Sequence, residues 1–284
     1  MAQLLASVVL AMALVGTAAP PGWTAADVAW LETSRVPGGL LAVEVAINGT
    51  GPFRLLLDTG STRTILTPAA ARLLTLEVYP GARVVAPGGS REAGQAWLSR
   101  LVAGPLAVER LPVVITALAD VQAGDRELDG ILGMDVLSRC RMLLDVPAGV
   151  AAVVTRRGAL PSTAAARRVP LVRDATGRLG VEGALGESVR MWLLDSGASV
   201  LTVFGTGDTR HGVAFAATAT RRATIAPGVA GLLRLGSVSV RTGPVAWLPG
   251  ARAGTHDGLL PLGLLGTVVL DPERREIVLL DRDR

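Results

Sequence analysis

The stretch LLLDTGST occupies residues 55–62, and a related stretch, WLLDSGAS, occupies residues 192–199. Each is an apolar run that ends in an acid, a hydroxyl residue and a glycine. An apolar run bounded by glycine predicts a buried strand that enters a tight turn. A carboxylate at the end of such a strand is costly to bury alone. The matching contexts of Asp58 and Asp195 therefore predict that the two acids are buried together and share one task.

A second pair of related stretches follows the first. Residues 129–137 read DGILGMDVL, and residues 257–265 read DGLLPLGLL. The dipeptide Val-Pro also occurs ahead of each acid-containing stretch, at residues 36–37 and 169–170. Because these features recur in the same order, the sequence predicts that the chain carries one fold twice.

These stretches resemble the aspartic protease family, which includes the pepsins and the retropepsins. In that family the Asp-Thr/Ser-Gly loop is catalytic, and an apolar-apolar-Gly strand followed by a short helix crosses beside it. The resemblance covers roughly residues 36–284. It implies a mainly β fold of two tandem retropepsin-like β-barrel lobes, related by pseudo-two-fold symmetry, with few short helices.

The resemblance also sets the domain limits that we expect. The first lobe is predicted at residues 36–155, a linker at 156–168 and the second lobe at 169–284. Retropepsins assemble their site from two identical chains, whereas both motifs stand here in one polypeptide. We therefore expect a single-chain retropepsin-like enzyme that pairs its lobes within a monomer.

Asp58 and Asp195 match the two catalytic acids of the family, which implies an aspartic endopeptidase. Two adjacent carboxylates cannot both ionise easily, so one stays protonated and polarises the scissile carbonyl. The other carboxylate is ionised and takes a proton from the attacking water. The resemblance implies a peptide or protein substrate, and no cofactor or metal is predicted.

The neighbours of the two acids are predicted to support the site. Gly60 and Gly197 permit a tight loop and a close approach of the backbone. The family resemblance gives Thr59 and Ser196 a buried hydroxyl network between the lobes. It also gives Ser61 a hydrogen bond to Asp58, whereas the second copy has Ala198 at that place, so the two acids are expected to have unequal surroundings.

Two further stretches bear on the site. By resemblance, a hairpin at residues 84–91 is the flap that closes over substrate, and residues 218–222 fall where a second flap would lie; a plain surface hairpin with a glycine turn fits residues 84–91 equally well. Pro261 stands where the first copy has Gly133. Because proline lacks an N–H and has a fixed φ, we expect a local rearrangement in the second lobe.

Composition argues against several other classes of function. All 28 basic residues are arginine, and they are scattered without aromatic residues between them, so the charge of +4 does not predict a nucleic-acid partner. Cys140 is the only cysteine, which excludes an intramolecular disulfide or a cysteine metal cluster. His211 and His256 lack both metal-ligand spacing and a Gly-x-Ser-x-Gly companion, so neither a zinc enzyme nor a Ser-His-Asp hydrolase is indicated. The alternative that stays open is a catalytically degenerate module that binds extended peptides or acts as a scaffold.

The N-terminus reads as a targeting segment. Residues 1–19 are apolar and end in small residues, which predicts a signal peptide and export to the periplasm or the extracellular space. The alternative is an uncleaved N-terminal membrane anchor, although the apolar run is short for a membrane span.

Overall fold

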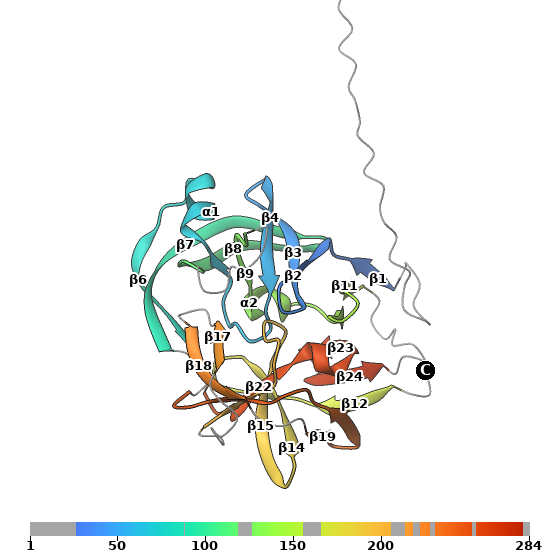
Figure 1. Cartoon of the computed structure of the whole chain (residues 1–284). Helices are drawn as coiled ribbons and strands as arrows, with labels where there is room; N and C mark the ends of the chain where they lie inside the picture. The colour runs from blue at the N-terminus through green and yellow to red at the C-terminus, as the bar shows by residue number, and fades with distance from the viewer. Residues whose placement is uncertain are drawn as a thin grey trace, which may run out of the picture.

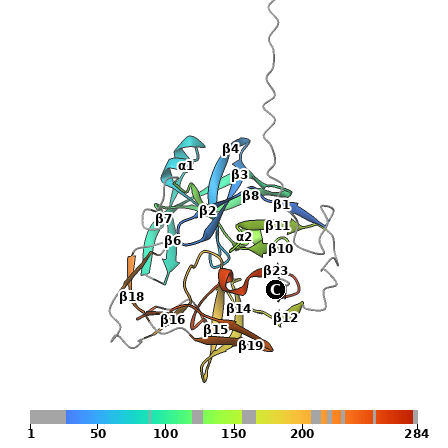
Figure 2. The same ribbon diagram turned by 45° about the vertical axis from the view of Figure 1, so that its right-hand side comes forward.

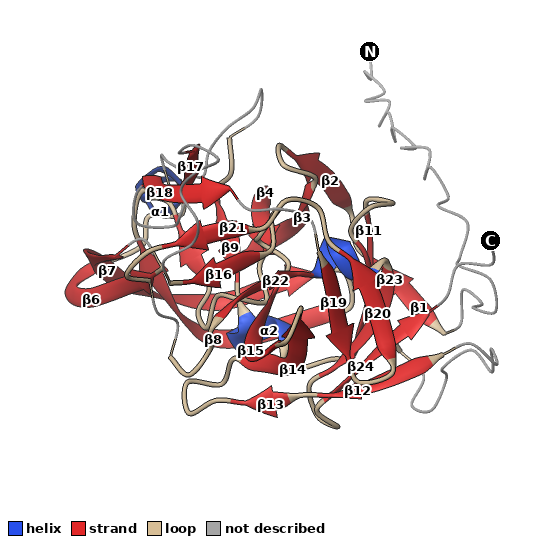
Figure 3. Cartoon of the chain, turned by 60° about the horizontal axis from the view of Figure 1, so that its bottom comes forward, coloured by secondary structure: helices blue, strands red, loops and turns tan. Residues whose placement is uncertain are grey.

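The structure is a computed structural model that describes residues 27–87, 89–118, 127–155, 166–205, 214–217, 222–227, 231–251 and 254–280. Strands make up most of these residues, as Figure 3 shows in red. The helices described are α1 (Pro68–Leu73), α2 (Met134–Leu137) and a 3-10 turn, η2 (Leu262–Leu265). The predicted mainly β fold with few short helices is therefore confirmed.

The first half of the chain forms an eight-stranded sheet in the order β2-β3-β4-β9-β5-β8-β7-β6. Its strands are β2 (Thr33–Val36), β3 (Leu40–Ile47), β4 (Thr50–Leu57), β5 (Ile65–Leu66), β6 (Tyr79–Ala86), β7 (Gly89–Ala103), β8 (Leu106–Ile115) and β9 (Gly130–Leu132). Strand β3 also pairs with β7, through Ala46↔Val102 and Ile47↔Leu101. This extra pairing curls the sheet back on itself, so the strands enclose a core.

The second half forms a ten-stranded sheet in the order β17-β18-β21-β16-β22-β15-β14-β19-β20, with β13 attached to β14. Its strands are β13 (Val172–Arg173), β14 (Leu179–Leu185), β15 (Ser188–Asp195), β16 (Thr202–Phe204), β17 (Ala214–Ala217), β18 (Arg222–Pro227), β19 (Leu232–Leu235), β20 (Val238–Arg241), β21 (Ala246–Leu248) and β22 (Gly258–Pro261). Strands β14, β15, β22 and β16 repeat the pairing of β3, β4, β9 and β5. In Figure 1 the first half, blue to green, lies above the second half, yellow to red.

A third sheet takes strands from both halves, in the order β1-β11-β10-β23-β24-β12. Its strands are β1 (Val28–Trp30), β10 (Met142–Asp145), β11 (Val150–Val154), β12 (Arg167–Pro170), β23 (Thr267–Asp271) and β24 (Glu276–Leu280). At its centre β10 pairs antiparallel with β23, from Met142↔Leu270 to Asp145↔Thr267. Figure 2 shows this sheet at the junction between the upper and lower halves. Backbone hydrogen bonds between β10 and β23 thus join the two halves of the chain in one sheet.

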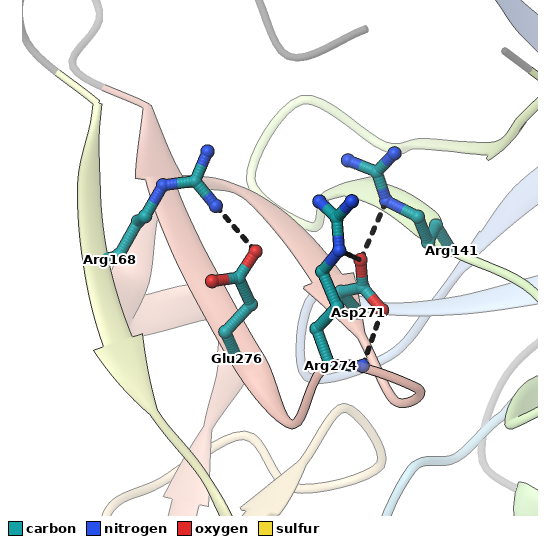
Figure 4. A network of polar contacts seen from close by, with 5 residues as sticks. All are labelled: Arg141, Arg168, Asp271, Arg274 and Glu276. Carbon is teal, nitrogen blue, oxygen red and sulfur yellow. Dashed lines mark hydrogen bonds and ion pairs between the residues drawn. The ribbon is translucent and has the colours of Figure 1, made fainter. Parts of the chain in front are cut away.

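Polar side chains close both ends of the central β10–β23 pair. Asp271 at the end of β23 forms a 2.9 Å ion pair with Nε of Arg141, just ahead of β10, and only 2% of the Asp271 side chain is exposed (Figure 4). At the opposite end, Thr267 donates a 2.6 Å hydrogen bond to the buried Asp145. At each end of the β10–β23 pair, therefore, an acidic side chain from one half of the chain interacts with a side chain from the other half.

The core consists almost entirely of buried Leu, Val, Ile and Ala, and its largest cluster draws on both halves of the chain. This composition follows from the aromatic content of 3%. Trp192 is the largest buried side chain, and it donates a 3.1 Å hydrogen bond from its indole N–H to the carbonyl oxygen of Gly183. The buried aliphatic clusters fix the strands that end at Asp58 and Asp195.

Local sequence explains the first turn and the first helix. The hairpin between β3 and β4 turns at Asn48 and Gly49, both with positive φ, as a two-residue turn requires. Thr67 caps α1 by accepting a hydrogen bond from the Ala70 N–H. The residues just ahead of this cap, Ile65 and Leu66, form β5 between β8 and β9.

The flap and linker predictions also have mixed outcomes. A hairpin of β6 and β7 is present and extends well beyond residues 84–91, from Tyr79↔Gln95 to Ala86↔Gly89. The second flap was predicted at residues 218–222, which lie outside the described residues apart from the first residue of β18. Residues 156–165 of the predicted linker also lie outside them, whereas Arg167 and Arg168 belong to β12. The domain limits stay a prediction.

The rearrangement expected at Pro261 is small. Pro261 is the last residue of β22, pairs with Asp195 and precedes η2, where the first half has the α-helix α2. Its φ of −59° suits both the strand end and the turn. The proline therefore changes the helix type and leaves the strand that crosses beside Asp195 in place.

Candidate active site

Two equivalent strand pairs deliver the predicted acids to one place. In the first half, β4 runs parallel to β9, with Leu57 opposite Leu132, and the Asp58 N–H donates to the Leu132 carbonyl at 3.1 Å. In the second half, β15 runs parallel to β22, with Asp195 opposite Pro261. Each acid thus stands where a buried parallel strand pair ends, and both side chains are half-buried.

The two loops approach each other so closely that only glycine fits beside the acids. A β-carbon on Gly60 would lie 2.7 Å from Cγ of Asp195, and one on Gly197 would lie 2.8 Å from Cγ of Asp58. Each carboxyl group therefore rests against the glycine of the opposite loop. Each acid also acts on the pKa of the other through a side-chain interaction. The structure thus brings the two predicted acids side by side.

A reciprocal network of buried hydroxyl groups holds the loops together. Thr59 Oγ1 donates to the Leu194 carbonyl at 2.9 Å and accepts from the Ser196 N–H at 3.0 Å. Ser196 Oγ donates to the Leu57 carbonyl at 2.7 Å and accepts from the Thr59 N–H at 3.0 Å. Each hydroxyl group makes two bonds to the other half, so each fixes the position of the opposite loop.

The environment of the acids favours one shared proton. Burial raises the pKa of Asp58, and N–H donors from Gly60 at 2.8 Å and Ser61 at 3.1 Å oppose this rise. Burial and then the negative charge of Asp58 raise the pKa of Asp195 well above its usual range. Since each ionised carboxylate disfavours ionisation of the other, the pair retains one proton where an exposed aspartate would have lost its own.

The expected role of the Ser61 hydroxyl group is wrong. Ser61 Oγ donates to the Arg63 carbonyl oxygen at 2.8 Å, and only the Ser61 backbone N–H reaches Asp58. A nearby backbone carbonyl competes successfully for a serine hydroxyl in a tight loop. Ala198 also supplies a backbone N–H to Asp195, so the Ser/Ala difference does not make the two acids unequal.

Replacing Ser61 with alanine is therefore expected to leave the acidic limb of the pH–rate profile within about 0.3 pH units of the parent, since no donor to Asp58 is lost. Ser196→Ala is the matched comparison, because it removes two bonds between the loops and should lower kcat. The measurement is peptide cleavage from pH 3 to pH 8 for both variants. An acidic limb that moves by a full unit in Ser61→Ala would show that its hydroxyl group turns to Asp58 in solution.

A polar brace that sequence reasoning missed supports the first loop. Thr64 donates to both oxygens of Asp135, through its N–H at 2.9 Å and its hydroxyl group at 2.7 Å. The same hydroxyl group accepts from the Gly133 N–H at 3.3 Å. Burial raises the pKa of Asp135, and the bonds from Thr64 oppose that rise. The signal was present in Asp135 itself, an acid inside an apolar helix.

The second loop replaces this brace with apolar residues. By the matching strand registers, Leu201 stands for Thr64, Pro261 for Gly133 and Gly263 for Asp135. The hydroxyl group, the N–H and the carboxylate are thus all absent together, so no buried polar group is left without its partner. The proline that departs from the first copy belongs to this coordinated change.

The remaining candidate residues lie apart from the acids. His256 is buried 3.7 Å from Asp174 in the second half, and His211 lies outside the described residues. Burial raises the pKa of the Cys140 thiol to about 12, which makes it a poor nucleophile. Within the described residues, no group of three His, Cys, Asp or Glu side chains is arranged to hold a metal ion.

Comparisons with known proteins agree with this geometry. Residues 43–136 match the sequence model of a family described as Aspartyl protease. A solved structure, the crystal structure of aspartic proteinase from Irpex lacteus, is similar with a TM-score of 0.53 and 13% sequence identity. The match covers 89% of this chain and 96% of that one. A search of curated proteins found no match.

The likeness to the solved structure shows the fold, and the family match covers the part of the chain that contains Asp58. The resemblance to the retropepsin-like and pepsin-like aspartic proteases is therefore confirmed. Family and fold together support a protease-like function. The catalytic roles of individual residues follow only as proposals.

Proposed function

We propose that the protein is an aspartic endopeptidase whose catalytic pair is Asp58 and Asp195. The observation that supports this proposal most directly is the packing of each carboxyl group against the glycine of the opposite loop, which places the two acids side by side. Burying two acids together is costly without a task. Their shared proton is the state that general acid–base hydrolysis of a peptide bond requires.

In the proposed reaction the two carboxyl groups have different tasks. Protonated Asp195 donates a hydrogen bond to the scissile carbonyl oxygen, while ionised Asp58 accepts a proton from the attacking water. The water oxygen bonds to the carbonyl carbon, and the proton taken by Asp58 then passes to the amine as the C–N bond breaks. Thr59 and Ser196 keep the two carboxyl groups in register by holding the loops.

The substrate we propose is a peptide in extended conformation. The β6–β7 hairpin supplies a strand edge in the first half, and strand-like hydrogen bonds with side-chain pockets are the usual means of binding such peptides.

The test is incubation with an unbiased peptide library from pH 3 to pH 8, with products read by mass spectrometry. We expect internal cleavage that a metal chelator does not prevent. The rival proposal, a degenerate module or scaffold, predicts saturable peptide binding without products at any pH. Activity abolished by the chelator and restored by zinc would contradict the acid-pair mechanism.

We further propose that both acids of one site come from the same chain, so that the active unit is a monomer. The network between Thr59 and Ser196 supports this, because it forms here within a single polypeptide. Mixing inactive Asp58→Asn and Asp195→Asn proteins should then restore no activity. Recovery of a substantial fraction of activity on mixing would instead indicate lobes exchanged between chains.

Export is proposed on the sequence alone. The predicted signal peptide at residues 1–19 and the alternative of a retained anchor both lie outside the described residues. Within the described residues, no helix has the length and apolar character needed to span a membrane. Cell fractionation together with the N-terminal sequence of the mature protein decides between export with cleavage and anchoring.

A further inference from the structure

Strand pairing with the acid-bearing strands identifies equivalent positions in the two halves. Leu56, two residues before the first acid, pairs with Ala42 of β3. Leu193, two residues before the second acid, pairs with Gly180 of β14. Ala42 and Gly180 therefore occupy the same place in their lobes, and so do the residues that precede them.

The residues two positions before Ala42 and Gly180 differ in their chemistry. The first half has Leu40 at the start of β3, and the second half has Arg178 just before β14. Arg178 is half-buried and follows the turn at residues 174–177. A guanidinium group in one half thus stands where the other half has an aliphatic side chain.

The turn before Leu40 reaches the loop that carries the acid of the opposite half. A β-carbon on Gly38 would lie 3.3 Å from Cβ of Ser199 in the second loop. Since the strand pairing is repeated in the second half, the turn before Arg178 is expected to approach the first loop in the same way. Burial raises the pKa of Asp58, and the positive charge of Arg178 is among the influences that oppose this rise.

The backbone that carries Arg178 is held firmly. Asp174 Oδ1 accepts hydrogen bonds from the Thr176 N–H at 2.8 Å, the Thr176 hydroxyl group at 2.7 Å and the Arg178 N–H at 3.0 Å. Although burial of Asp174 disfavours its charged form, these bonds from Thr176 and Arg178 keep the pKa of Asp174 below its usual value. The turn therefore holds the stem of Arg178 at a fixed place.

Among the described residues, the guanidinium group of Arg178 has no ion pair, and its Nε is buried without a hydrogen bond. A planar guanidinium group is suited to bind a carboxylate through two parallel hydrogen bonds. A half-buried guanidinium group without such a bond gains most from an acidic group brought by a ligand.

We propose that Arg178 determines specificity by binding the side chain of an Asp or Glu residue of the peptide substrate. The inference rests on the proposed peptidase function, since it names the chemistry of one subsite in the same cleft. The acidic residue occupies the part of the cleft beside the turn at residues 174–177. The equivalent place beside Leu40 offers an aliphatic surface, so the two halves of the cleft select different side chains.

The test scans Glu and its neutral isostere Gln through each position of a peptide that the protein cleaves. At one position we expect kcat/KM to be roughly 10- to 100-fold higher with Glu, as befits a hydrogen-bonded charge. Arg178→Gln should bring this ratio close to one. Arg178→Glu should reverse the preference, so that Lys at the same position becomes the better residue.

Two variants control the experiment. Arg234→Glu makes the same change of charge on the exposed part of β19 and should leave the Glu/Gln ratio intact. Arg178→Lys keeps the charge without the planar group and should retain part of the preference, which tests the charge if the Gln variant does not fold. A peptide that is cleaved with the same Glu/Gln ratio by the parent and by Arg178→Gln would overturn the inference while leaving the peptidase intact. Absence of any cleavage by the parent would overturn the proposed function and this inference together.

Discussion

Replacing Asp195 or Asp58 with asparagine is expected to lower kcat for peptide cleavage by roughly 10²- to 10⁴-fold, which is the scale of positioned acid–base groups. Asparagine has nearly the shape of aspartate, so the loops should keep their hydroxyl network. The neutral amide can neither take a proton from water nor share one across the pair. The measurement is single-substrate kinetics on a peptide found in the library screen.

The stability of the same variants is expected to depend less on pH than the stability of the parent protein. Burial raises the pKa of Asp58 and raises that of Asp195 further, so the folded protein binds protons that the unfolded chain releases near pH 3.9. The stability that this contributes is complete below about pH 4 and is lost as pH rises through the folded-state pKa values. The asparagine variants avoid this loss, so their free energy of unfolding should exceed that of the parent by a margin that grows toward neutral pH.

Urea unfolding at pH 4 and pH 7 measures this margin. Glu109→Gln, which removes an exposed carboxylate on β8, is the matched control and should show neither effect. Full activity in Asp58→Asn or in Asp195→Asn would contradict the proposal that the replaced acid is catalytic.

Breaking the ion pair between Arg141 and Asp271 is expected to destabilise the protein by about 3–5 kcal/mol, because one buried charge is left without its partner. Asp271→Asn is the better single change, since Asp271 Oδ1 also accepts from the Arg274 N–H at 3.0 Å and asparagine keeps that acceptor. Arg141→Met removes the other charge. The combined variant should lose much less than the sum of the two single changes.

Urea unfolding of the two single variants and the combined variant provides the full cycle. The exposed pair of Arg83 and Glu92 supplies a control, and Glu92→Gln should change stability by about 0–1 kcal/mol. Additive losses in the cycle would mean that the two charges do not interact in solution.

The sequence was sufficient to predict the acids and the strands that carry them. The reason is local, since an apolar run that ends in Asp-Thr-Gly or Asp-Ser-Gly specifies both a buried strand and the turn after it. In such a turn, side-chain chemistry and backbone geometry depend on adjacent residues.

The errors arose where residues far apart in the chain decide the outcome. The hydroxyl group of Ser61 had two acceptors within reach, and the choice between them depends on the exact path of the loop. The Arg141–Asp271 pair requires the register between β10 and β23, which no periodicity reveals.

The sheet between the halves also has a consequence during protein synthesis. Strand β10 is complete when the ribosome has passed residue 145, yet its partner β23 ends only at residue 271. Because folding during synthesis proceeds from the N-terminus, the first lobe emerges with one edge of β10 unpaired and with its acid alone. A growing chain that has not reached Asp195 therefore has no acid pair, and the sheet that joins the two halves can form only after β23 has been made.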